Sequence, residues 1–103
     1  MLLPIEETVA ELANGDKPLL HSRLVDLSNL NSEELGLFEQ AWAAIEPRRR
    51  RQIMYRLVEV AENNFELNFD GIFTSCLKDD DALVRCKAIE GLWESEDASL
   101  LTP

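Results

Sequence analysis

The segment from Asp79 to Trp93 constrains the fold more than any other part of the chain. Three aspartates open it, and Val84, Ala88 and Leu92 then follow at a spacing of four. Side chains four residues apart lie on one face of an α-helix, and acidic side chains are favourable at a helix start. The segment therefore predicts an amphipathic helix over 82–93 that begins after an aspartate-rich turn.

The rest of the chain repeats this kind of signal, and none of it alternates with the period of a β-strand. Asn31 followed by Glu34 is the signature of a capping box, and Pro47 suits the first turn of a helix but not its interior. We therefore predict an all-α fold of six to seven helices with short connections. The expected ranges are about 4–14, 19–27, 31–46, 47–63, 70–77, 82–93 and, after a cap at Asp97, 98–101.

A shift of 35 residues sets Arg50 on Arg85, and their apolar neighbours coincide as well. This shift falls within the roughly 30–47 residues of two-helix repeats. On a helical wheel both arginines point to the centre of the apolar side, where an unpaired charge is costly. We expect the aspartates at 79–81 to supply a partner for Arg85, and Asp70 or Glu46 to supply one for Arg50.

The pattern D-x-x-V-R-x-x-A-x-x-x-L, which begins at Asp81, resembles the first helix of a HEAT repeat. From Pro47 onward the chain is similar to the bacterial HEAT-like proteins, a group that includes the bilin-lyase-type repeats. The resemblance implies a right-handed α-solenoid of stacked antiparallel helical hairpins. It also implies a structural ladder through the stack, made by Arg50, Arg85, Asp79 and Asp81.

The resemblance is uneven, and this suggests how the chain is organised. We expect a single HEAT-like domain over 1–103, in which 1–46 form atypical N-terminal capping helices and 47–103 form the repeats. End repeats are often atypical because they close the stack. The last repeat is expected to be truncated at its C-terminus, which predicts a homodimer through its exposed face.

The charge distribution restricts the classes of partner. The formal net charge is −10, and the 47–58 segment, with five bases and no acid, lies between acidic blocks with nine acids and two bases and with eleven acids and three bases. Nucleic-acid and anionic membrane surfaces both attract basic proteins, so neither is expected as a partner. No apolar run is long enough to span a bilayer.

Few residues suggest chemistry. The two cysteines, Cys76 and Cys86, do not have a zinc-site spacing, and we expect both to be buried free thiols in a reducing cytoplasm. The N-terminus lacks the zones of a signal peptide, which also favours a cytoplasmic location. His21 is the only histidine and is expected on the surface. No catalytic residue, cofactor or metal site is predicted, and the aspartate run is better explained as a helix cap than as a calcium loop.

Four residues are candidates for contact with a partner: Arg48, Arg51, Tyr55 and Trp93. The arginine run at 48–51 can bind an acidic partner or phosphate, but pairing with the surrounding acids within the chain is favoured. Tyr55 lies on the polar side of its helix, where it is either a contact residue or an ordinary surface tyrosine. Trp93 lies at the edge of its apolar stripe.

These observations predict a non-enzymatic scaffold or adaptor that binds another protein of unknown identity. The alternative is an accessory subunit or chaperone-like factor of an enzyme, of the bilin-lyase type. A third class, the nucleic-acid-binding HEAT proteins of the DNA-glycosylase type, is disfavoured by the acidic charge. Fold class alone does not identify an activity.

Overall fold

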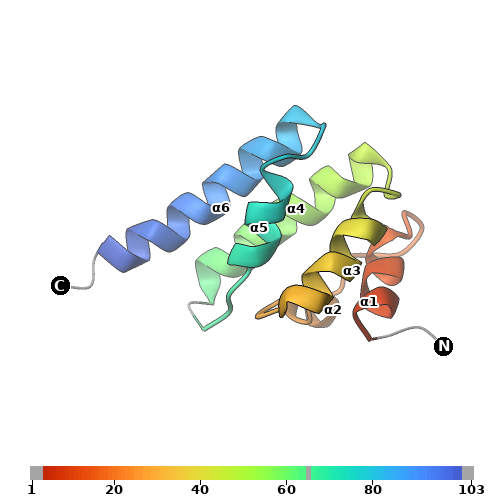
Figure 1. The fold of residues 1–103 in the computed structure, drawn as a ribbon, viewed down its shortest axis with the longest axis horizontal. Coiled ribbons are helices and arrows are strands. Elements are labelled where there is room, and N and C mark those ends of the chain that lie inside the picture. Colours follow the sequence, from red (N-terminus) through yellow and green to blue (C-terminus); the bar gives the residue numbers. More distant parts are fainter. Residues whose placement is uncertain (1–3, 65, 101–103) are drawn as a thin grey trace.

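The computed structural model describes residues 4–64 and 66–100, and of 94–100 it describes the backbone alone. The described residues form helices and loops without any strand, which confirms the predicted all-α class (Figure 1). Six helices occur in these ranges, namely α1 (Pro4–Ala13), α2 (His21–Val25), α3 (Ser32–Trp42), α4 (Pro47–Asn63), α5 (Asp70–Cys76) and α6 (Ala82–Leu100).

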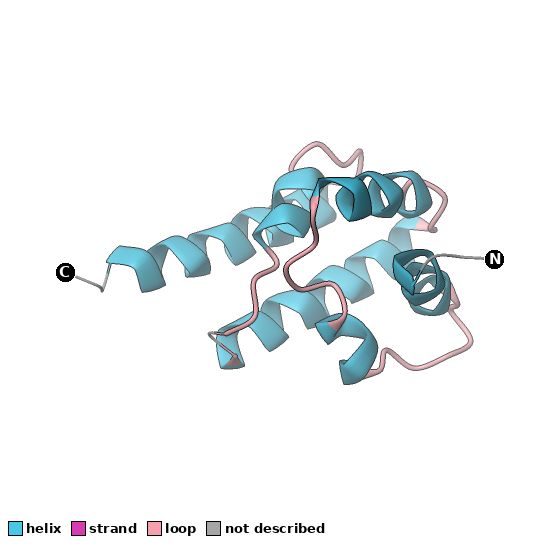
Figure 2. Ribbon diagram, turned by 60° about the horizontal axis from the view of Figure 1, so that its bottom comes forward, coloured by secondary structure: helices cyan, strands magenta, loops and turns pink. Residues whose placement is uncertain are grey.

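The helices lie along an elongated body of 45 × 28 × 24 Å. At one end α1 packs against α3, with α2 beside α1 and α4. Toward the other end α6 packs against both α4 and α5, and α4 and α6 run side by side in the same direction (Figure 1). Figure 2 shows the same helices with their connecting loops, and the C-terminal part of α6 extends beyond the rest of the body.

Two predicted helix starts are confirmed. The Asn31 side chain accepts a hydrogen bond from the Glu34 amide at 2.8 Å, and the Glu34 carboxylate accepts one from the Asn31 amide at 3.0 Å. This capping box satisfies two backbone donors that the first turn of α3 would otherwise leave free. Pro47 stands at the first position of α4, where its missing N–H costs nothing.

Aromatic and aliphatic side chains from all six helices fill one core. Phe38 and Trp42 of α3 stack with their ring centroids 5.1 Å apart. Their helical spacing in the sequence predicts that Trp42 lies in the core, and its 6% exposure confirms this. In the other half, Phe69 and Phe73 meet edge to face at 6.3 Å. Met54 of α4, which is fully buried, belongs to this same core.

Four expected boundaries are wrong. The third helix, expected over 31–46, ends at Trp42. The second helix, His21–Val25, is shorter than the expected 19–27. The spacing of Leu20, Leu24 and Leu27 predicts that all three point inward, but Leu20 precedes the helix and is 52% exposed. Asp70, whose residue type predicts a helix cap, is instead the first residue of α5, and Phe69 occupies the cap position. No break separates 82–93 from a further helix, because α6 continues through Asp97 to Leu100; residue 101 of the expected last helix lies outside the described residues.

The predicted buried face of α6 is confirmed at Val84 and Ala88, which are fully buried, and Leu92 packs against the core. Ile89, which a helical wheel also places on the apolar side, is 55% exposed instead. The inward face includes Gly91, where a Cβ would lie 2.5 Å from the ring of Phe73 on α5. The two helices therefore pack closely at a residue that has no side chain.

Candidate functional site

The start of α4 is the polar centre of the molecule, because three consecutive arginines there bind two different loops. Arg49 and Arg50 are buried, with exposed fractions of 9% and 7%, and Arg51 is partly buried. Arg48 is the only member of the run that is exposed. Three of the four arginines in this run therefore make contacts within the protein and do not form an exposed basic patch.

Arg49 binds main-chain carbonyl oxygens at the end of α1 and in the loop between α1 and α2. Its Nε donates to the carbonyl oxygen of Leu12 at 2.7 Å, and its Nη2 donates to the carbonyl oxygen of Lys17 at 2.7 Å. The third nitrogen, Nη1, donates to the Gln52 side chain at 3.1 Å. One guanidinium thus joins the end of α1, the following loop and the first turns of α4.

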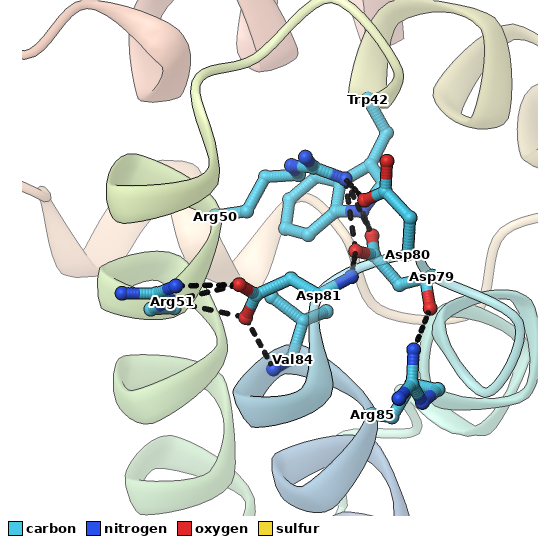
Figure 3. Close-up of polar contacts among 8 residues, drawn as sticks. All are labelled: Trp42, Arg50, Arg51, Asp79, Asp80, Asp81, Val84 and Arg85. Carbon is cyan, nitrogen blue, oxygen red and sulfur yellow. Dashed lines mark hydrogen bonds and ion pairs between the residues drawn. The ribbon is translucent and has the colours of Figure 1, made fainter.

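Arg50 meets Asp79 in the loop between α5 and α6 (Figure 3). Its Nη1 lies 2.9 Å from both carboxylate oxygens, and the two side chains are 8% and 2% exposed. The Trp42 indole donates to the same carboxylate at 2.7 Å, and the Asp81 amide donates to it at 2.9 Å. Asp79 therefore ties α3, α4 and the following turn together, and the expected partners of Arg50, Asp70 or Glu46, are replaced by Asp79.

Asp81 makes the second link to α4 and begins α6. Arg51 grips its carboxylate with Nε and Nη2, the closest contact being 2.6 Å, while the Val84 amide donates to the other side at 3.0 Å (Figure 3). The hydrogen bonds from Arg51 are the main reason that the pKa of the Asp81 carboxyl falls to about 2. Arg51, a candidate for partner contact, is engaged within the chain.

Arg85 does not take an aspartate side chain as its partner. Its Nη1 donates at 2.7 Å to the main-chain carbonyl oxygen of Asp79, as Figure 3 shows. The structure thus brings Arg50, Asp79, Asp81 and Arg85 together at one loop. That they continue as a ladder through a stack of repeats stays a prediction.

The remaining contact candidates lie on the surface. Tyr55 is 54% exposed on α4, and the Lys87 ammonium of α6 lies 4.1 Å from the centre of its ring. Trp93 is 63% exposed, on the same helix as the exposed side chains of Leu83 and Ile89. The surface of α6 therefore carries apolar side chains that nothing in the described part of the chain covers.

The two cysteines differ in environment. Cys76 is 1% exposed, and its burial, followed by the nearby charge of Asp79, raises the pKa of its thiol to about 12. Cys86 is exposed, so the expectation that both thiols are buried is wrong for this residue. The reason is helix geometry, because Cys86 lies two residues from each of the buried residues Val84 and Ala88 and therefore projects from the opposite face of α6.

A cavity of about 310 Å³ lies beside this network between α3 and α5. Phe38 and Trp42 supply its apolar lining, and Arg50, Lys78 and Asp80 supply charges of both signs. The Nε of Arg50 is buried without a hydrogen-bond partner. Opposite charges within a few ångströms suit a polar or zwitterionic ligand. However, the most buried of these charges, Arg50 and Asp79, are already paired with each other.

Sequence reasoning missed Arg49, the most highly connected arginine of the run. Its acceptors are main-chain oxygens, which any residue offers, so no pattern of acidic side chains marks them. The only available signal was the position of Arg49 at the edge of the apolar stripe of α4.

The described part of the chain holds neither a cluster of metal-ligating side chains nor a membrane-spanning helix. Among the side chains that the structure describes, those of 4–64 and 66–93, no three His, Cys, Asp or Glu gather closely enough to hold a metal ion. None of the helices described within 4–64 and 66–100 has the length and apolar character needed to cross a lipid bilayer. His21 is exposed, as expected.

Comparisons with models of protein families, with curated proteins and with solved structures returned no match. The functional interpretation therefore depends on the residues and their geometry.

Proposed function

We propose that the protein is a HEAT-like α-solenoid module that acts as a scaffold or adaptor and holds another protein on its helical surface. The observation that carries this proposal is the arrangement of α4, α5 and α6. Two parallel helices with α5 packed against the second support an interpretation as successive helical hairpins (Figure 1). Helical repeats of this kind bury a shared core and leave long surfaces for partners.

The loop network supports the same interpretation. Arg50 and Arg51 on α4 reach the aspartates that precede α6, so one helix of the pair binds the start of the next. Such contacts fix the spacing of neighbouring hairpins, because each arginine is held in one orientation by two carboxylate oxygens. They stabilise the architecture and leave other surface residues free to bind.

The face of α4 offers a contact surface for a partner. Tyr55 lines a shallow hollow of about 400 Å³ together with Leu19, Gln52 and Arg56. Exposed tyrosine beside arginine is typical of residues that contribute strongly to protein interfaces. Arg48 lies about two turns before Tyr55 on α4 and is also exposed.

We also place the protein in the cytoplasm, where the free thiols of Cys76 and Cys86 would stay reduced.

The test is capture from an extract of the source cells with the intact chain as bait, followed by mass spectrometry. We expect a protein in stoichiometric amount, whose recovery falls about tenfold with Tyr55→Ala. Such a loss corresponds to about 1.4 kcal/mol, the scale of an interface hot spot. Leu77→Ala, at an exposed apolar side chain that follows α5, is the matched control and should leave recovery unchanged. Equal recovery with both variants would contradict a role for this face.

A further inference from the structure

A groove of about 430 Å³ runs between α1 and α3, and none of the arginines at 48–51 lines it. Buried side chains of Val9 and Ile45 close its floor, with exposed fractions of 2% and 5%. The other apolar residues that line it are small or partly exposed: Ala10, Ala13, Leu37, Ala41 and Ala44.

The shape of this groove fits a helix. Alanines line both walls, so the backbone of an incoming helix can approach closely while its larger side chains enter the space between α1 and α3. Ala10 and Ala44 are exposed, which leaves the groove open to solvent. Apolar grooves between two helices recur in proteins as sites for the apolar face of an amphipathic helix.

The charges around the groove indicate which residues should flank the apolar face of a bound helix. Glu6 lines the α1 side, and Glu33 on α3 is exposed and stands four residues before Leu37, on the same face of the helix. The only arginine of the first 46 residues, Arg23, is paired with Glu11 and Asp26. Those 46 residues hold nine acids and two bases, and the one charged residue that lines the groove is acidic.

We propose that the groove between α1 and α3 binds an amphipathic helix of another protein, whose apolar stripe is flanked by lysine or arginine. The inference rests on the proposed function, because it assumes that the protein binds a protein partner, and it names a second surface and its chemistry. A second copy of this chain is a poor occupant, since a net charge of −10 on each copy opposes their approach.

The probe is a labelled helical peptide of about 14 residues, roughly 21 Å long, with leucines at helical spacing and lysines beside them. Fluorescence anisotropy with the intact chain should give a saturable curve that weakens as sodium chloride is added, because salt screens the attraction. The same peptide with glutamates in place of the lysines should bind about tenfold more weakly.

Variants of the chain locate the site. Ala10→Gln with Ala44→Gln places larger polar groups in the groove without changing the charge, and we expect about tenfold weaker binding of the lysine peptide. Ala43→Gln, at the exposed position next to Ala44 but outside the groove lining, is the matched control. Glu33→Gln should weaken binding about threefold, whereas Glu62→Gln on α4 removes the same charge and should have no effect.

Several results would overturn the proposal. These are equal binding of the lysine and glutamate peptides, full binding by the Ala10→Gln/Ala44→Gln protein, or equal losses with Glu33→Gln and Glu62→Gln. Sedimentation that shows a dimer dispersed by the groove variant would identify a second copy as the occupant and would also overturn it. Captured partners that depend on Tyr55 alone would leave the proposed function intact while the groove proposal fails.

Discussion

Two loops meet the first turn of α4, and neighbouring arginines hold them by different chemistry. Arg49 binds carbonyl oxygens at the end of α1 and in the loop that follows it. Arg50 and Arg51 bind the loop after α5 through aspartate side chains. The first arrangement depends on backbone shape, and the second depends on residue type. They should therefore respond differently to substitution, because a carbonyl survives any change of its own side chain and a carboxylate does not.

The largest expected effect comes from Asp79→Ala. It leaves the Arg50 guanidinium buried without its carboxylate and the Trp42 indole without its acceptor. Breaking a buried pair in this way costs about 3–5 kcal/mol of the free energy of unfolding. Urea denaturation measures the loss. Asp80→Ala is the control, because the Asp80 side chain is 86% exposed and its contact with Arg50 should contribute under about 1 kcal/mol.

Arg49→Ala should cost less, about 1.5–3 kcal/mol, which is the range for hydrogen bonds that involve a charged group. Its carbonyl acceptors lie next to a loop that can open to water. Hydrogen exchange should speed up in residues 14–20, while the loop at 79–81 keeps its protection. Arg48→Ala, at the exposed neighbour, should change stability by less than about 0.5 kcal/mol. A loss as large as that of Asp79→Ala would remove the distinction between the two loops.

Gly91→Ala tests whether close packing of α6 against α5 stabilises this part of the molecule in addition to the charged contacts of the loop after α5. The added methyl group would meet the Phe73 ring at 2.5 Å, so we expect a loss of about 1–3 kcal/mol in thermal or urea unfolding. Gly36→Ala on α3 is the control, because nothing lies within 4 Å of the added carbon. There the same change should raise stability by about 0.5–1 kcal/mol. Similar behaviour of both variants would show that α5 and α6 do not pack closely at Gly91.

The smallest expected effect is on how the stability of the protein changes at acid pH. Arg51 lowers the pKa of Asp81 from 3.8 to about 2, so the folded state favours the charged carboxylate. The contribution to stability is complete above about pH 4 and is lost as the pH falls toward about pH 2. Asp81→Asn should lower stability at neutral pH and flatten the fall in urea-measured stability over that interval. With Asp80→Asn the fall should persist, and a flat profile in both variants would argue against the Arg51–Asp81 pair.

The same contrast explains what the sequence could predict. The capping box at Asn31, the start of α4 at Pro47 and the involvement of Arg50 and Asp79 all depend on residue types with specific side-chain chemistry. The partner of Arg50 was not predictable, because the identity of the matching aspartate depends on how α4 and α6 lie in space. Arg49 was missed because its acceptors are carbonyls that every residue has.

The orientation of α6 was predicted correctly at Val84, Ala88 and Leu92 and wrongly at Ile89. A helical wheel weights apolar side chains, so Ile89 was placed on the buried face although it is exposed. The buried face instead includes Gly91, which contributes no hydrophobicity but permits a close approach to Phe73. Close packing at a glycine is a property of the pair of helices, and the sequence of one helix does not contain it.

The hydrogen bond from Trp42 to Asp79 gives the molecule an optical reporter. Trp42 is 6% exposed beside a carboxylate, while the other indole, Trp93, is 63% exposed. A water-soluble quencher such as acrylamide will extinguish the emission of Trp93 first, and in a Trp93→Phe background the remaining fluorescence comes from the junction of α3, α4 and the aspartate loop alone. Opening of that junction can then be followed in real time, by light, without attaching a dye.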